Sequence, residues 1–209
     1  MTGPQIGVLA FQGDIREHIA ILSSLGASVR SVRRPEELDG LDGILLPGGE
    51  STTIDRLARV FDMMDPLRTA IRGGLPAYGS CAGMILLADE IKDGMHDQQT
   101  IGGINMVVRR NAFGRQVDSF EGPVSIESVG KPDFHAVFIR APWVESVGAD
   151  VEVLGTVSAG EAMGRIVAVR QGNLIATSFH PELTDDHRVH GLFVEIARKY
   201  SQDRKEQSQ

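Results

Sequence analysis

The stretch LPAYGSCAGMILLADE, residues 75–90, passes from a short apolar run, through a glycine-flanked break, into a second apolar run with helical character. Two earlier stretches have the same order: QIGVLAF (5–11) precedes DIREHIAILSSLG (14–26), and DGILLPGG (42–49) precedes ESTTIDRLARVFDMM (50–64). Short apolar runs that stop at turn residues predict buried strands, and the segments after them have helical spacing. Strands that alternate with helices predict a parallel sheet.

The second half of the chain has a different pattern. GGINMVVRRNAFGRQVDSFEGPVSIESVG (102–130) contains short alternating runs broken by glycine, which favours antiparallel strands. RIVAVRQGNLIATSF (165–179) carries QGN as a hairpin turn, and DDHRVHGLFVEIARKY (185–200) predicts a closing helix. We therefore expect an α/β fold: a three-layer open mixed sheet, parallel at its centre, with antiparallel additions and helices on both faces.

Length and composition limit the class of protein. The 209 residues suit a single domain, which we place over residues 1–200, with 201–209 as a flexible C-terminal tail. A net charge of −7 without a basic tract argues against nucleic acid, and no segment approaches the ~18 apolar residues of a membrane span. The single cysteine, Cys81, excludes a disulfide framework and a multi-cysteine zinc site. Its unpaired thiol, with no secretory leader at the N-terminus, indicates a cytoplasmic protein.

The break Gly79-Ser80-Cys81-Ala82-Gly83 has the pattern of a nucleophile elbow, with cysteine in the place of serine. A residue that ends a strand and begins a helix lies at the carboxyl edge of the sheet, where open α/β folds place their ligands. A helix N-terminus there favours the thiolate. The alternative is a small buried apolar residue, the usual fate of a lone cysteine, so the elbow requires a base.

Of the six histidines, His180 is the candidate base. It ends the apolar run LIATSF and is followed by Pro181 and Glu182; proline biases His180 towards extended chain, in which residues i and i+2 point the same way. Glu182 would then orient one imidazole nitrogen while the other faces the thiol of Cys81, completing a nucleophile, base and orienter. The other histidines are expected at helix surfaces, in a loop or at a strand start: His18, His187, His190, His96 and His135.

The stretch LPGGEST (46–52) places two glycines after a neighbouring buried strand. Their N–H groups, Gly49 above all, could approach a carbonyl oxygen and form an oxyanion hole with the amide of Ala82. The alternative is an ordinary turn that leads into a helix capped by Ser51 or Thr52. Three loops at one sheet edge favour the first interpretation.

These motifs resemble those of the class I (triad) glutamine amidotransferases, and more narrowly the glutaminase subunits of pyridoxal 5'-phosphate synthases. The resemblance covers nearly the whole chain to Tyr200 and departs from the usual pattern only slightly, at Phe11 and Ser80. It is carried by GVLAFQGDIREH, LPGGESTTI, YGSCAGMILLA, RRNAFGRQVDSFE, FIRAP and TSFHPELTDDHRVHGLF.

The resemblance implies hydrolysis of L-glutamine to glutamate and ammonia, with Cys81 as nucleophile, His180 as proton carrier and Glu182 as its orienter. It also implies a glutamine site lined by matched motif residues, whose guanidinium and carboxylate groups suit an α-carboxylate and an α-ammonium. These residues are Gly48, Gly49, Glu50, Arg110, Ile139 and Arg140. No metal or organic cofactor is implied.

The resemblance further implies a partner, a (β/α)8-barrel synthase subunit that receives the ammonia and makes pyridoxal 5'-phosphate within a large mixed complex. Two alternatives remain open: a triad glutaminase that feeds another synthase, such as the imidazole glycerol phosphate branch, and a non-catalytic regulatory protein on the same fold. A cysteine protease or thiol-stress protein has no additional signal in the sequence.

Overall fold

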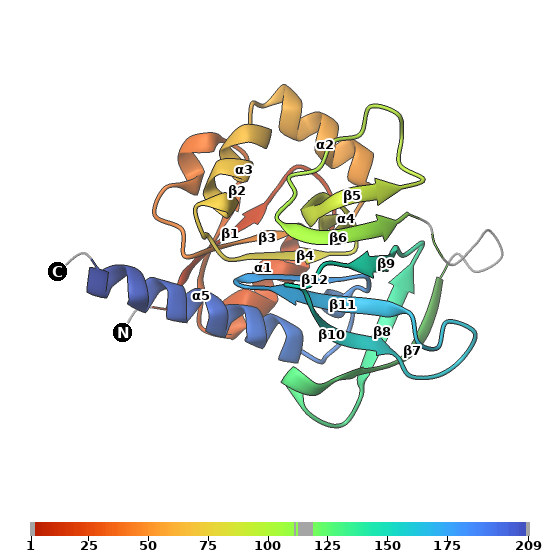
Figure 1. The fold of residues 1–209 in the computed structure, drawn as a ribbon. Helices are drawn as coiled ribbons and strands as arrows, with labels where there is room; N and C mark the ends of the chain where they lie inside the picture. Colours follow the sequence, from red (N-terminus) through yellow and green to blue (C-terminus); the bar gives the residue numbers. More distant parts are fainter. Residues whose placement is uncertain (1–2, 111, 113–118, 208–209) are drawn as a thin grey trace.

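The computed structural model describes residues 3–110, 112 and 119–207 (Figure 1), so part of the motif RRNAFGRQVDSFE (109–121) lies outside the described residues. The strands are β1 (Gln5–Leu9), β2 (Ser28–Val32), β3 (Gly43–Leu46), β4 (Ala77–Ser80), β5 (Ala88–Lys92), β6 (Ile104–Arg109), β7 (Ser119–Ile126), β8 (Phe134–Ile139), β9 (Trp143–Val147), β10 (Glu152–Val157), β11 (Ile166–Gln171) and β12 (Leu174–Thr177). The helices are α1 (Ile15–Ser24), α2 (Ser51–Val60), α3 (Met64–Arg72), α4 (Ala82–Leu87) and α5 (Arg188–Gln207), with 3-10 turns η1 (Pro35–Leu38), η2 (Glu127–Val129) and η3 (Pro181–Leu183).

One mixed sheet organises the chain, in the order β2-β1-β3-β4-β12-β11-β10-β7-β8. Its first five strands are parallel, because β1 pairs with β2 and β3, and β4 pairs with β3 and β12, all in parallel register. From β12 onwards the pairs are antiparallel, beginning with the β11–β12 hairpin that the QGN turn predicted. The predicted fold class, parallel at the centre with antiparallel additions, is confirmed.

Helices cover both faces of this sheet (Figure 1), and the buried apolar side chains form two cores, one beneath each set of helices. Strand β3 contributes to both, since Ile44 and Leu46 belong to the core beneath α2, α3 and α4, whereas Leu45 belongs to the core beneath α1 and α5. A strand that is buried on both faces needs a continuous apolar run, which is what GILL supplies. The three layers leave the carboxyl ends of the parallel strands open.

Two segments differ from the sequence predictions. The predicted helix at 82–90 ends at Leu87, and Ala88–Lys92 instead forms β5, since the next strand along the chain, β6, pairs with it in parallel. The expected tail at 201–209 is helical as far as Gln207. Its first residue, Ser201, is buried, and Arg204 donates to Asp42 (2.8 Å) and to the carbonyl of Leu41 (3.2 Å), so tertiary contacts extend α5.

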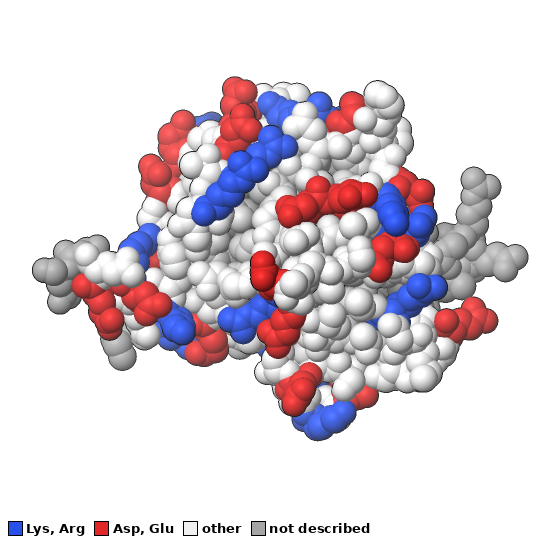
Figure 2. Space-filling view, viewed as in Figure 1, with Lys and Arg blue, Asp and Glu red and all other residues white. Residues whose placement is uncertain are grey.

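The surface carries mixed charge. Figure 2 shows acidic and basic side chains interspersed over the visible face, with white surface between them. No helix among the described residues is long and apolar enough to cross a membrane.

Candidate active site

Four neighbouring parallel strands, β1, β3, β4 and β12, end at the same edge of the sheet. The segment after each strand carries polar or glycine residues: Asp14 after β1, Gly48 and Gly49 after β3, Cys81 after β4, and His180 after β12. Parallel register therefore brings together loops that are far apart in the sequence. This edge is the candidate active site.

Cys81 stands between β4 and α4 in a strained backbone conformation, with φ 48° and ψ −99°. The two flanking glycines make the turn possible. A Cβ on Gly79 would lie 2.4 Å from the carbonyl carbon and oxygen of Gly83, and a Cβ on Gly83 would lie 2.1 Å from the carbonyl oxygen of Leu46. The backbone elements thus approach too closely for any other residue, and the turn holds the free Cys81 at the sheet edge, only 5% exposed.

His180 and Glu182 are in contact, with 2.7 Å between Nδ1 and Oε1. The backbone that joins them is not the extended chain that the sequence predicted, because Pro181–Leu183 forms a 3-10 turn that folds Glu182 back onto the imidazole. Both side chains are almost fully buried. Since Glu182 occupies Nδ1, Nε2 is the nitrogen left for the thiol of Cys81, which lines the same cavity as His180.

A second carboxylate, that of Asp14, lies 3.5 Å from the same Nδ1 atom. Burial alone would disfavour a charged His180, but hydrogen bonds to Asp14, Cys81 and Glu182 outweigh it and raise the pKa of His180 to about 12. The hydrogen bond to His180 outweighs burial at Asp14 and lowers the pKa of that carboxyl. An imidazolium at neutral pH is therefore the state that this surrounding favours.

Two histidines that the sequence placed at helix surfaces, His18 and His190, are instead fully buried, so that prediction was wrong. His18 is one helical turn from the buried Leu22 in α1, and His190 is one turn from Phe193 in α5, so both stand on the apolar faces of their helices. They contact each other directly behind Glu182.

A cavity of about 290 Å³ opens in front of Cys81. It brings together most of the sequence-predicted residues, namely Gly49, Glu50, Cys81, Ala82, Arg110, Ile139, Arg140 and His180. Gly48 and Glu182 do not line it: Glu182 lies behind the imidazole, and a Cβ on Gly48 would lie 2.5 Å from Cε1 of His180. The cavity therefore has a thiol and an imidazole at its floor and charged groups along its walls.

The charged wall is built on the Glu50–Arg110 ion pair, with 3.0 Å between Oε1 and Nη2. Arg110 also donates to Gln98 at 2.9 Å. Glu50, and not Ser51 or Thr52 as predicted, is the N-cap of α2, because its carboxylate accepts the backbone N–H of Thr53 at 2.9 Å. One carboxylate thus caps a helix and fixes a guanidinium beside the thiol.

The glycine turn after β3 faces the loop after β1. Gly49 has φ +144°, and a Cβ there would lie 2.5 Å from Oε1 of Gln12. The same oxygen of Gln12 accepts the backbone N–H of Glu50 at 2.7 Å. Gly13 is equally close to this turn, since a Cβ on it would lie 1.7 Å from the carbonyl oxygen of Gly48. Both the backbone and a side chain of the first loop hold the glycine turn.

Sequence reasoning missed Gln12, Asp14, Ser51 and Ile85, which also line the cavity. The signal was available for the first two, because FQGD directly follows a predicted parallel strand. Among the described residues, Asp14, His180 and Glu182 form the one group of three side chains of metal-binding type whose ligand atoms lie within 4.8 Å of one another. The contacts of both carboxylates with Nδ1 of His180 account for this proximity, so the group needs no metal ion to explain it.

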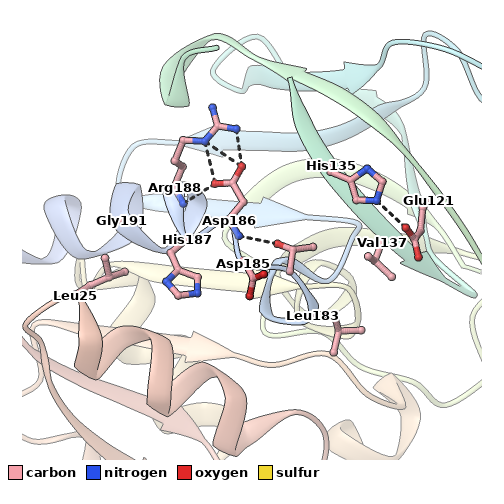
Figure 3. A pocket seen from close by; sticks show the side chains of 11 residues that line it. Leu25, Glu121, His135, Val137, Leu183, Asp185, Asp186, His187, Arg188 and Gly191 are labelled. Atoms are coloured by element: carbon pink, nitrogen blue, oxygen red, sulfur yellow. Dashed lines mark hydrogen bonds and ion pairs between the residues drawn. The ribbon is translucent and has the colours of Figure 1, made fainter. Parts of the chain in front are cut away.

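A larger cavity of about 840 Å³ lies elsewhere, along η3 and the start of α5 (Figure 3). Four of its charged or titratable side chains form two pairs: His135 contacts Glu121 at 2.6 Å, and Arg188 donates through Nε to Asp186 at 2.9 Å. Cys81 does not line it. The chemistry therefore points to the smaller cavity.

Comparison with known proteins agrees with this geometry. A family model described as the SNO glutamine amidotransferase family matches residues 8–199. The pyridoxal 5'-phosphate synthase subunit PdxT of Salinispora arenicola is 63% identical over 95% of this chain and 98% of its own length. The PdxT subunit of Streptomyces avermitilis is also 63% identical, over 95% of this chain and 96% of its own length.

A solved structure, described as the crystal structure of glutamine amidotransferase, superposes with a TM-score of 0.84 at 47% identity, over 92% of this chain and 98% of that one. The chain belongs to the SNO glutamine amidotransferase family.

Proposed function

We propose that Cys81, His180 and Glu182 are the catalytic triad of a glutaminase with a single domain, predicted over residues 1–200 and extended by the contacts of Ser201 and Arg204. Its family and its 63% identity to pyridoxal 5'-phosphate synthase subunits make the chain an amidohydrolase of L-glutamine that supplies ammonia for vitamin B6 synthesis. The observation that carries the residue assignment is that Cys81 and His180 line one cavity, while Glu182 contacts Nδ1 of His180 at 2.7 Å from behind.

The reaction follows from the placement of these groups. The sulfur of Cys81 attacks the side-chain amide carbon of glutamine, and the amide oxygen takes up the negative charge. When the C–N bond breaks, His180 donates its proton to the leaving nitrogen, so that ammonia departs and a γ-glutamyl thioester remains. His180 then removes a proton from water, which attacks the thioester and releases glutamate and the thiol. Glu182 holds the imidazole in position and stabilises its charged form throughout.

The cavity walls suit the rest of the glutamine molecule. We assign the α-carboxylate to the guanidinium groups of Arg110 and Arg140 and the α-ammonium to Glu50, because these cavity-lining side chains have the complementary sign. The other carboxylate in the lining, that of Asp14, is engaged with His180. Ile139, whose carbonyl oxygen lies 4.0 Å from Sγ of Cys81, closes the cavity opposite the elbow, and Gly48 gives the imidazole room. No metal or organic cofactor enters any of these steps.

The oxyanion hole is assigned to the backbone N–H groups of Gly49 and Ala82. Both residues line the cavity beside Cys81, and Ala82 directly follows the nucleophile. Donors of this kind typically contribute about 2.7–4 kcal/mol to lowering the barrier of acyl transfer.

We propose a (β/α)8-barrel synthase subunit as the partner that receives the ammonia, in a large mixed complex in the cytoplasm. The relatives are named as synthase subunits, and an unpaired catalytic thiol persists best in a reducing compartment. The partner would complete the oxyanion hole by turning the Pro47-Gly48-Gly49 backbone, and the part-exposed segment FQGDIRE (11–17) is the docking surface at the active edge. The segment AGMILL (82–87), the other surface that the sequence suggested, is buried and does not serve.

Ammonia release from L-glutamine, measured with and without the barrel subunit, tests this function. We expect the barrel to stimulate the wild-type chain and Cys81→Ala to release no ammonia with either. Equal wild-type rates with and without the barrel would contradict partner activation. A Cys81→Ala chain that retained wild-type activity in pyridoxal phosphate synthesis from glutamine would favour the non-catalytic alternative, and stimulation only by another synthase would favour a different pathway.

A further inference from the structure

Two buried histidines take no part in the reaction described above. His18, in the first turns of α1, and His190, in α5, are both 0% exposed. Burying an imidazole ring is unfavourable unless its nitrogens find partners, because each nitrogen that leaves water loses a hydrogen bond. The position of the two rings behind Glu182 indicates a role in holding that carboxylate.

The two rings continue the line of contacts that begins at Cys81. Nδ1 of His18 lies 2.9 Å from Nε2 of His190, and Nε2 of His18 lies 3.4 Å from Oε2 of Glu182. The other carboxylate oxygen, Oε1, is the one that contacts His180. The hydroxyl of Ser80 donates to Oε2 at 3.3 Å. Glu182 is therefore held between His180 on one side and His18 with Ser80 on the other.

The contacts favour one tautomer for each ring. If His18 carries its proton on Nε2, that N–H points at a carboxylate, and Nδ1 accepts from the Nε2–H of His190. The opposite tautomer would place a lone pair of His18 against the Glu182 carboxylate and leave an N–H of His190 buried without an acceptor. In the described part of the chain, no atom meets hydrogen-bond geometry with Nδ1 of His190 or Nε2 of His18. The first tautomer leaves a lone pair unpaired on Nδ1 of His190 and places the N–H of His18 near a negative charge, with 3.4 Å between Nε2 and Oε2 of Glu182, as an electrostatic contact.

We propose that His18 and His190 are positioning residues of the glutaminase: as a neutral pair they hold Oε2 of Glu182, so that Oε1 stays aligned on Nδ1 of His180. The role rests on the proposed triad, since it acts entirely through Glu182. His190 orders the ring of His18, and its own ring packs edge-on against Tyr78, with 5.8 Å between ring centroids.

The charges around the pair agree with neutral rings. Burial, then the neighbouring His190 and His180, lower the pKa of His18 well below its usual value. Burial and the nearby His187 lower the pKa of His190 to about 3. Burial raises the pKa of Glu182, and the hydrogen bond and charge of His180 oppose that rise, so a further N–H at Oε2 helps to keep the carboxylate ionised.

A matched pair of substitutions separates positioning from packing. Glutamine at 18 reaches the place of Nε2 with an N–H donor, whereas asparagine reaches only the place of Nδ1, next to His190. We expect His18→Asn to lower kcat of the complete synthase complex ~10- to 100-fold with KM for glutamine changed less than about twofold, and His18→Gln to stay within about threefold of wild type. His135→Gln, at an exposed histidine paired with Glu121, is the control and should match wild type.

The thermal midpoints of the two position-18 variants are measured alongside, and equal kcat values for them would overturn the proposal. If His18→Asn does not fold, ¹⁵N spectra of the histidines in the wild-type chain decide. We expect His18 to be neutral at pH 7 with its proton on Nε2. A proton on Nδ1, or a charged His18, would overturn the proposal.

The triad is tested separately with Cys81→Ala in the same complex. Loss of ammonia release in Cys81→Ala together with unchanged kcat in His18→Asn would reject the positioning role and keep the triad. Ammonia release by Cys81→Ala at the wild-type rate would reject the triad itself, and the positioning role with it.

Discussion

At the scale of single residues, the site depends on two carboxylates, Glu182 and Glu50, that differ in burial. Glu182 contacts Nδ1 of His180 at 2.7 Å from a fully buried position. Glu50 caps α2 and fixes Arg110 from a position that is open to the cavity. The difference in burial predicts different kinetic consequences. Loss of the Glu182 carboxylate should affect the chemical step, whereas loss of Arg110, the partner of Glu50, should affect substrate binding.

Glu182→Gln should lower kcat by ~10³-fold or more with little change in KM. The amide keeps the volume but loses the charge that stabilises the imidazolium, and its NH₂ end favours the wrong tautomer of His180. Steady-state glutaminase kinetics of the complete complex measure this. A kcat within tenfold of wild type would show that Glu182 is not the orienter.

Arg110→Lys should raise KM for glutamine roughly 10- to 100-fold and change kcat less, because a lysine cannot reproduce the planar, bidentate contact with a carboxylate. Arg109→Lys is the matched control on the adjacent residue, since Arg109 pairs with Asp93 and Glu145 and does not line the cavity. Equal KM values for the two variants would contradict the assignment of Arg110 to substrate.

At the scale of the elements, the elbow between β4 and α4 depends on close backbone packing. Gly83 allows α4 to lie against β3, and Gly79 allows the helix to start directly after the strand. Gly191, by contrast, lies in α5 with no atom within 4 Å of an added Cβ. The same substitution should therefore have opposite effects in the two helices.

Gly83→Ala should destabilise the chain by about 2 kcal/mol or more and displace Cys81, because its Cβ would meet the Leu46 carbonyl oxygen at 2.1 Å. Gly191→Ala should stabilise it by about 0.5–1 kcal/mol, the usual gain from alanine in a helix. Denaturant unfolding of both variants measures the contrast. Destabilisation by Gly191→Ala equal to that by Gly83→Ala would refute it.

The helices and strands differ in how far they could be predicted from the sequence. The alternating strands and helices and the elbow are local patterns, so the fold and the grouping of these motifs at one edge could be predicted. The contact between His180 and Glu182 was also expected, but through extended chain and not through the 3-10 turn that forms it.

The contact of His18 with His190 joins residues that are 172 positions apart in the sequence. The strand at Ala88–Lys92 depends on its pairing with β6. Such tertiary contacts leave no local signal in the sequence. The extension of α5 to Gln207 is of the same kind, because Arg204 contacts Leu41 and Asp42.

At the scale of the whole molecule, the buried histidines link folding to pH. His18 and His190 are neutral when folded and take up protons when unfolded, near a pKa of about 6.5. Their folded pKa values are lowered, in the case of His190 to about 3, so the unfolded state binds more protons below pH 6.5. Their contribution to stability is therefore present above pH 6.5 and is lost as the pH falls below that value, in the case of His190 down to about pH 3.

For His190 this loss is about 2 kcal/mol between pH 7 and pH 5. His180, whose pKa is raised, acts in the opposite direction in the same window, so the comparison needs a variant. His190→Leu should lose less stability than wild type between these pH values by about that amount, as measured by denaturant unfolding. His135→Leu, at an exposed site, should follow wild type, and a His190→Leu chain that did so as well would contradict the coupling.

The central claim is that Cys81 is the nucleophile of a glutaminase, and its direct test is to capture the acyl-enzyme. The complete complex is mixed with L-glutamine, quenched in acid during turnover, digested and analysed by mass spectrometry. A γ-glutamyl thioester on the peptide that contains Cys81, absent from Cys81→Ser, is the predicted result. Wild-type turnover with no acyl group on that peptide, together with full ammonia release by Cys81→Ser, would contradict it.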